Sequence, residues 1–171
     1  VVWDIYWFWY NQPINMDFKK QDLSHNYSIV LSVTFHAILP LLATGSNDSM
    51  TILYDLTLSP PFIQHKFIDH TCSVICVTFH PHKSLLATGS SDQTTIIYNI
   101  SRFPPTIQDH LKHHINSVAS ITFHPSFSLF ATGSYDGSVI LYNQTIAQTI
   151  IKYHFKDQIK TENFLILTVA F

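Results

Sequence analysis

Cysteine and glycine are scarce in this chain of 171 residues, and each shortage excludes a class of site. Its two cysteines, Cys72 and Cys76, would lie about 13 Å apart on an extended strand, which is too far for a disulfide bond. A reducing compartment is therefore the simpler expectation. Three of the four glycines stand in separate ATGS segments, so the chain has no glycine-rich loop to cradle a phosphate.

Charge is also scarce, at 12% of residues against about 25% in an ordinary domain. The net charge of −2 argues against electrostatic capture of nucleic acid or of an anionic membrane, since both need a basic surface. No apolar run approaches the roughly 18 residues of a membrane span, and the start of the chain lacks a basic signal-peptide region. We therefore expect a cytoplasmic or nuclear protein that has no membrane partner and does not contact nucleic acid directly.

One pattern recurs three times at a constant interval of 44 residues. Its central element is LLATGSND at 41–48, LLATGSSD at 85–92 and LFATGSYD at 129–136. The same interval separates a preceding set of phenylalanines and a following set of tyrosines, namely Phe35, Phe79 and Phe123, and Tyr54, Tyr98 and Tyr142. Each period contains three short runs rich in β-branched and aromatic residues, separated by turn residues, which predicts an all-β chain of antiparallel sheets.

This pattern resembles the WD40 family, whose repeats of about 40–45 residues each form one four-stranded blade of a β-propeller. The family's Gly-His pair corresponds here to Asp69-His70 and His113-His114, with Ser24-His25 shifted by one residue. Its Trp-Asp pair corresponds to Tyr54-Asp55, Tyr98-Asn99 and Tyr142-Asn143.

The resemblance implies a structural hydrogen-bond network in each repeat. An aspartate on a tight turn would orient the histidine, while a hydroxyl would satisfy the other ring nitrogen. The residues at these positions are His70, Thr88, Asp92 and Tyr98 in one repeat, His114, Thr132, Asp136 and Tyr142 in the next, and Thr44, Asp48 and Tyr54 in the first, where His25 lies one residue further out.

The two ends of the chain match parts of further repeats. Val1–Ile5 contains a Trp-Asp pair and matches the third strand, while 165–171 matches the first strand of a following repeat. We expect one partial propeller domain, cut from a longer chain, with three complete repeats and two partial ones. The predicted boundaries are 1–22, the end of a preceding blade with its connecting loop, then 23–66, 67–110 and 111–153 for the repeats, and 154–171 for a loop and the next first strand.

Six of the eleven histidines fall into two periodic sets, which favours a structural role over metal binding. These sets are His25, His70 and His114, and His36, His80 and His124. No catalytic, cofactor-binding or metal-binding residues are nominated, because the Ser, Thr, His and Asp side chains are already used by the repeat pattern. The aromatic stretch at 6–16 has two open interpretations, a buried outer strand or an exposed patch that grips a partner.

Positions that vary within the repeat are candidates for partner contact. By resemblance to the family, they would lie around the narrower face of the propeller and its central channel. They are Ser28, Cys72 and Asn116 before the first strand, and Asn47, Ser91 and Tyr135 in the S-x-D turn. The predicted function is a non-catalytic scaffold for protein–protein assembly without a cofactor. The alternative is a reader module for a modified peptide or nucleic acid.

Overall fold

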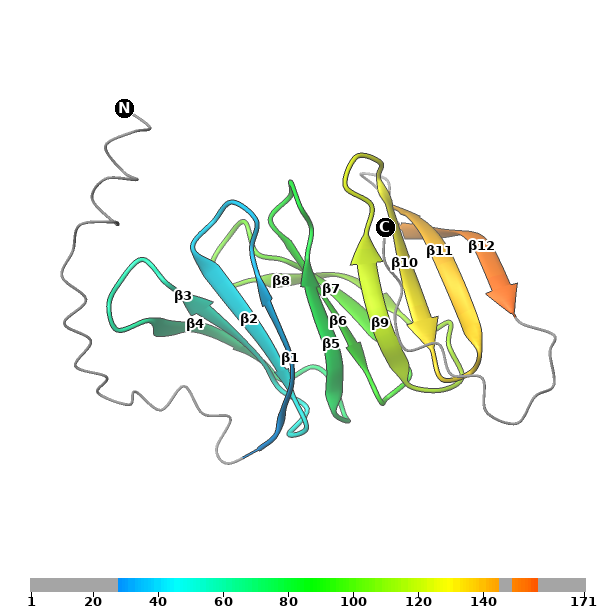
Figure 1. The fold of residues 1–171 in the computed structure, drawn as a ribbon, viewed down its shortest axis with the longest axis horizontal. Coiled ribbons are helices and arrows are strands. Elements are labelled where there is room, and N and C mark those ends of the chain that lie inside the picture. Colours follow the sequence, from blue (N-terminus) through cyan, green and yellow to red (C-terminus); the bar gives the residue numbers. More distant parts are fainter. Residues whose placement is uncertain (1–27, 145–148, 157–171) are drawn as a thin grey trace.

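The computed structural model describes residues 28–144 and 149–156, and within these ranges the regular structure is entirely β (Figure 1). Twelve strands form three antiparallel sheets of four strands each. The first sheet contains β1 (Val30–Phe35), β2 (Leu41–Ser46), β3 (Thr51–Asp55) and β4 (Phe62–Phe67). The second contains β5 (Val74–Phe79), β6 (Leu85–Ser90), β7 (Thr95–Asn99) and β8 (Thr106–Leu111), and the third β9 (Val118–Phe123), β10 (Leu129–Ser134), β11 (Ser138–Gln144) and β12 (Thr149–Lys156).

This architecture confirms the predicted all-β fold of four-stranded antiparallel blades. Several sequence predictions lie outside the described residues: the Trp-Asp pair at Trp3, the aromatic stretch at 6–16, His25 and the partial repeat at 165–171. In the described part of the chain, no helix is long and apolar enough to cross a membrane.

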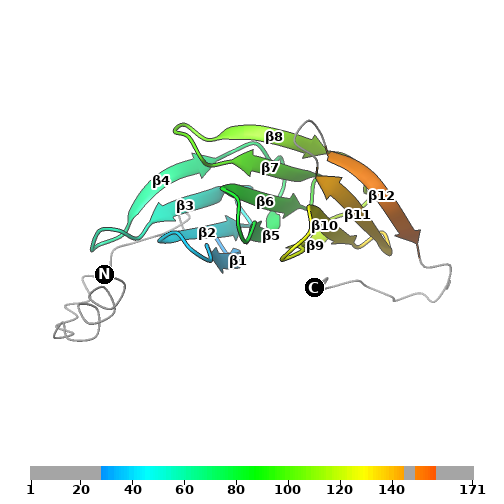
Figure 2. The same ribbon diagram turned by 90° about the horizontal axis from the view of Figure 1, so that it is seen from above.

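The three sheets stand side by side in sequence order and together form an arc (Figure 2). The innermost strands β1, β5 and β9 follow the concave side of the arc, and the outermost strands β4, β8 and β12 follow its convex side. Neighbouring sheets meet through these inner strands, since β1 contacts β5 and β5 contacts β9. Segments that occupy equal positions in the repeat therefore lie at the same end of successive sheets.

The apolar core lies between neighbouring sheets, because each sheet buries one face against the next. Phe79 of the second sheet packs with Leu41, Leu53 and Phe67 of the first. Phe123 of the third sheet likewise packs in one cluster with residues of the second sheet. All six residues of β6 are buried, since this strand is covered on both faces. The glycine of its ATGS segment, Gly89, leaves room for the third sheet to approach.

A tight turn joins the second and third strands of every sheet. Its third residue adopts a left-handed backbone in each case: Ser49 at φ 70°, Gln93 at φ 73° and Gly137 at φ 77°. Glycine occupies this conformation without steric cost, whereas other residues do so less readily. The turn places the aspartate of the S-x-D segment next to the segment that enters the first strand, as the hydrogen bonds below show.

Candidate functional site

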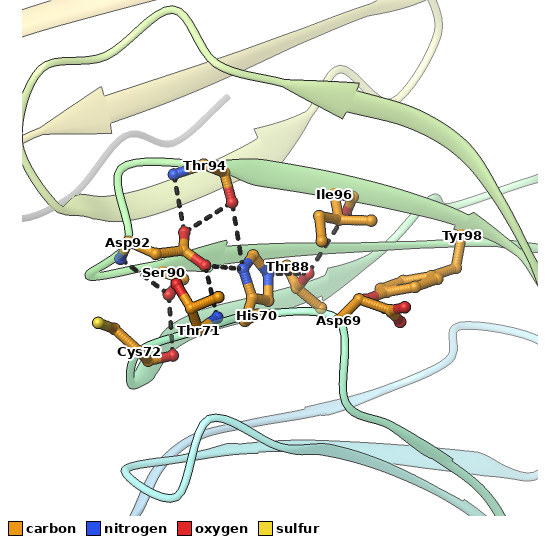
Figure 3. Close-up of polar contacts among 10 residues, drawn as sticks. All are labelled: Asp69, His70, Thr71, Cys72, Thr88, Ser90, Asp92, Thr94, Ile96 and Tyr98. Carbon is orange, nitrogen blue, oxygen red and sulfur yellow. Dashed lines mark hydrogen bonds and ion pairs between the residues drawn. The ribbon is translucent and has the colours of Figure 1, made fainter.

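A buried hydrogen-bond network surrounds His70 in the second sheet (Figure 3). His70 Nδ1 lies 2.9 Å from Asp92 Oδ2, and His70 Nε2 lies 2.8 Å from Thr88 Oγ1. The side chains of His70 and Asp92 are only 2% and 9% exposed. The sheet order explains the convergence, because Thr88 lies on β6, Asp92 on the turn that follows it, and His70 on the segment that enters β5.

The carboxylate of Asp92 fixes the tautomer of His70. Burial opposes ionisation of Asp92. Hydrogen bonds from Thr94 and from the Thr71 backbone, together with the interaction with His70, outweigh this effect of burial and lower the pKa of Asp92 to about 2. An ionised carboxylate only accepts hydrogen bonds, so His70 Nδ1 carries the proton and donates it. Nε2 of the neutral ring then accepts from the Thr88 hydroxyl.

The third sheet repeats this arrangement with His114. Its Nδ1 lies 3.0 Å from Asp136 Oδ2, and its Nε2 lies 2.7 Å from Thr132 Oγ1. Hydrogen bonds from Ser138 and from the Ile115 backbone overcome the effect of burial and lower the pKa of Asp136 to about 2. The same backbone framework therefore holds an equivalent set of side chains in two successive sheets.

A second hydroxyl completes both networks, and the sequence analysis did not identify it. Thr94 Oγ1 donates to Asp92 Oδ1 at 2.6 Å and lies 3.2 Å from His70 Nδ1. Ser138 takes the same place beside Asp136 and His114. The sequence does show this feature, because a hydroxyl residue stands two positions after each of these aspartates.

In the first sheet, Met50 stands where the others have this hydroxyl, and its backbone N–H donates to Asp48 Oδ1 at 3.0 Å. Thr44 and Tyr54 of the same sheet hydrogen-bond through their side chains. The histidine that would complete this network, His25, lies outside the described residues. The first sheet therefore has the aspartate turn and the Thr–Tyr contact of the repeat, with a methionine in the hydroxyl position.

Tyr98 and Tyr142 each contact the residue that precedes the histidine, and each also hydrogen-bonds the threonine of its own sheet. The Tyr98 hydroxyl donates to Asp69 Oδ2 at 3.1 Å, and the Thr88 side chain also hydrogen-bonds Tyr98. Burial, followed by the charge of Asp69, raises the pKa of Tyr98 above its ordinary range. In the third sheet the Tyr142 hydroxyl lies 3.3 Å from His113 Nδ1. Tyr98 and Tyr142 thus each connect the third strand of their sheet to the segment before its first strand.

The other periodic histidines hold the turn after the first strand. Nδ1 of His36 accepts the backbone N–H groups of Ile38 and Leu39, at 3.1 and 3.0 Å. Nδ1 of His80 and of His124 accept two backbone N–H groups in the same way. The ring of His36 also packs on Phe79 of the next sheet, and that of His80 on Phe123. His36 and His80 therefore link neighbouring sheets, a role that periodicity alone did not indicate.

Acidification is expected to destabilise the fold mainly through these histidines. Burial lowers the pKa of His70 and His114, with partial opposition from Asp92 and Asp136, and it also lowers that of His36. Burial, then Lys83 and His82, lowers the pKa of His80 to about 4. An unfolded histidine titrates near 6.5, so the unfolded chain binds more protons below that pH and stability falls as pH drops.

The measurement is the free energy of unfolding from urea titrations at several pH values. We expect the steepest loss between about pH 6.5 and about pH 4. The lowered pKa values of Asp92 and Asp136 add a further loss only below about pH 4. A free energy that stayed constant, or increased, on acidification from pH 7 to pH 4 would contradict this assignment.

The six predicted contact residues lie at one end of the three sheets. Asn47, Cys72, Asn116 and Tyr135 are exposed there, and Ser28 and Ser91 are half-buried. Backbone hydrogen bonds tie each S-x-D turn to the segment before the first strand: Asn47 to Ile29, Ser91 to Ser73 and Tyr135 to Ser117, at 2.9 to 3.0 Å. Ser73 Oγ also donates to Asn47 Oδ1 at 2.7 Å, which links the first two sheets at this end.

The two cysteines are both free thiols. Cys72 is exposed at the candidate contact end, whereas Cys76 lies between sheets, where burial raises the pKa of its thiol to about 12. Within 28–144 and 149–156, no group of three or more His, Cys, Asp or Glu residues is arranged to hold a metal ion.

A protein-family model described as "WD domain, G-beta repeat" matches residues 19–55, 62–99 and 105–143, which is more than half of the chain. A comparison with curated protein sequences found no match.

Similar solved structures include Saccharomyces cerevisiae Sqt1, with a TM-score of 0.69 and 20% identity over 75% of this chain. U3-55K and the WD40 repeats of RRP9 each have a TM-score of 0.70 and 14% identity, over 79% and 80% of this chain. The match spans only 35% of the Sqt1 chain and 41% of each of the other two. At these identities the likeness is one of fold.

Proposed function

The chain belongs to the WD40-repeat family, and from this we propose that it is a non-catalytic scaffold that binds other proteins through one end of its sheets. In this proposal it works inside the cell, in the cytoplasm or nucleus, as part of a multi-subunit complex and without a cofactor. Fold alone supports a function only by analogy, and the side chains at that end of the sheets give the more direct support.

The observation that carries the proposal is that variable side chains project from a rigid, hydrogen-bonded end of the sheets. Tyr135 and Asn116 are exposed, while the backbone that carries them is tied by the bond from Tyr135 N to Ser117 O and by Ser134 Oγ donating to Asn116 O. In the second sheet, Ser90 Oγ likewise donates to Cys72 O at 3.0 Å. A backbone that is already ordered loses little entropy on binding, which favours affinity.

The surface also offers an aromatic anchor, Tyr135, and only one lysine among its described residues. Tyrosine is enriched among the residues that contribute most to protein interfaces. Among the described residues, the three S-x-D turns contain no lysine or arginine, and the segments before β1, β5 and β9 contain a single lysine, Lys112. Because a nucleic-acid interface depends on several cations for phosphate contacts, a single lysine at this end favours a protein partner.

A triple variant, Ser91→Ala, Asn116→Ala and Tyr135→Ala, tests the contact surface. We expect at least a tenfold loss of captured partner, because truncating a central aromatic contact commonly costs about 2 kcal/mol. The measurement is a quantitative pull-down with mass spectrometry, performed with and without nuclease.

A control triple, Ser59→Ala, Arg102→Ala and Phe103→Ala, removes exposed side chains at the opposite end of the sheets and should leave capture unchanged. Full capture by the first triple variant would refute the proposed surface. Capture that disappeared with nuclease would favour the nucleic-acid reader instead.

A further inference from the structure

The junctions between sheets carry different chemistry at the end opposite the candidate contact surface. A pocket of about 310 Å³ opens there between the second and third sheets, lined by residues that include Lys83, Asn99 and Gln144. Lys83 precedes β6, Asn99 ends β7, and Gln144 ends β11 of the neighbouring sheet. The pocket is thus formed by two sheets and depends on their packing.

The junction between the first and second sheets, which we call the first junction, provides a comparison within the same chain. One period of 44 residues earlier, the equivalents of Lys83, Asn99 and Gln144 are Leu39, Asp55 and Ile100. Ile100 packs against the apolar cluster between the first and second sheets. At the second junction, Lys83 stands in place of an apolar residue and Asn99 in place of an acid. Gln144 stands in place of the packed isoleucine. All three changes make the site more polar or more positive.

Gln144 is held in this pocket with one hydrogen-bonding group unused. Its side chain is buried, with the residue 3% exposed, and its Oε1 accepts from Lys83 Nζ at 3.5 Å. Its Nε2 is buried and has no hydrogen-bond partner among the described residues. A buried amide donor without a partner costs free energy, and such groups in native proteins usually have a specific role. Isoleucine would have avoided this cost, as it does at position 100.

The lining selects for an anion. Lys83 supplies a positive charge, and Ser84, Ser101, Gln108 and Asn99 supply hydroxyl and amide groups. The described residues that line the pocket include no aspartate or glutamate. A carboxylate matches this set, since it accepts charge-assisted hydrogen bonds from an ammonium and further bonds from amide N–H groups.

We propose that the pocket between the second and third sheets binds a carboxylate side chain of an acidic peptide segment. Lys83 provides the charge, and Gln144, whose Oε1 accepts from Lys83 Nζ, positions that ammonium in the pocket. A single lysine in a chain of net charge −2 gives little attraction for a phosphate backbone, which needs several cations, so a peptide is favoured over nucleic acid. This site lies at the other end of the sheets from the proposed contact surface. An experiment can therefore refute one of the two proposals without refuting the other.

The test uses the whole chain and two labelled probes, a peptide of alternating leucine and glutamate and a matched peptide with glutamine in place of glutamate. Binding is measured by fluorescence anisotropy. We expect the acidic peptide to bind more tightly, and Lys83→Leu and Gln144→Ile each to weaken it about tenfold. Both substitutions introduce the residue that the chain already uses at its first junction, so the fold should tolerate them.

The control Lys66→Leu removes the same charge from the exposed surface of β4 and should leave binding unchanged. Gln144→Ile should also keep or raise the midpoint of urea unfolding, because it removes an unpaired buried amide. Equal binding of the two peptides would overturn the proposal. An equal loss of acidic-peptide binding in Lys66→Leu and in Lys83→Leu would also overturn it. If a single-stranded oligonucleotide bound more tightly than the acidic peptide, and Lys83→Leu abolished that binding, the pocket would be a nucleic-acid site and the peptide proposal would be wrong.

Discussion

Replacing His70 with alanine is expected to lower the free energy of unfolding by about 3 kcal/mol. The ring is buried between Asp92 on one side and Thr88 on the other, and it bonds to both. Its removal leaves a cavity and takes a partner from two buried polar groups, which are two separate costs. His114→Ala should have a similar effect, because His114 has the same two kinds of partner in the third sheet.

Urea unfolding followed by circular dichroism measures this loss. The matched control is His110→Ala, which removes an exposed histidine from β8 and should change stability by less than about 0.5 kcal/mol. If His70→Ala and His110→Ala had equal effects, the buried network would not be the stabilising element that its geometry indicates.

A single methyl group at Gly89 is expected to destabilise the protein by about 3 kcal/mol. An alanine Cβ there would lie 2.6 Å from Cys76 Sγ and 2.8 Å from Val118 Cγ1, both far inside van der Waals contact. Val118 belongs to β9, so relief requires the second and third sheets to separate or their side chains to move. Close packing between sheets transmits such strain because the interior has few voids.

Gly137→Ala provides the matched control, since it adds the same methyl group in open space. Apart from its neighbours in the chain, no atom of the described residues lies within 4 Å of that Cβ, so the expected cost is that of the left-handed backbone at φ +77°, about 1 kcal/mol. Thermal and urea unfolding of both variants measure the difference. The combination of Gly89→Ala with Val118→Ala should recover part of the loss, because it removes one of the colliding atoms. A Gly89→Ala variant as stable as Gly137→Ala would contradict a steric role for this glycine.

The sequence predicted much of the repeat framework, because the same short-range pattern specifies each sheet. Three ATGS segments with flanking apolar runs indicated the strands, and the strands appear at those positions. The residues Thr88, Asp92 and His70 also meet in space, although up to 22 positions separate them in the chain. The resemblance to the WD40 family predicted this meeting, and the period of 44 residues extended the prediction to the next sheet, since equal spacing in sequence becomes equal placement in each sheet.

Details of the site depended on side-chain reach, which spacing does not encode. Tyrosine is shaped differently from tryptophan, and the Tyr98 hydroxyl reaches Asp69 as well as Thr88. The stabilising hydroxyl of Thr94 was equally absent from the sequence argument, because its contact with His70 Nδ1 exists only once the turn has formed. The role of His80 as a turn acceptor packed on Phe123 required two neighbouring sheets to be in place.

The repeats of a four-stranded antiparallel unit follow from local sequence, because turn residues and apolar runs act over short distances. The surroundings of each repeated side chain, in contrast, depend on how the sheets pack. Phe35, Phe79 and Phe123 occupy the same place in the repeat, yet they are 69%, 7% and 7% exposed. Burial is a property of the neighbouring sheet, not of the strand that carries the side chain. For the same reason Ile100 packs into a core at one junction, while Gln144 lines a polar pocket at the next.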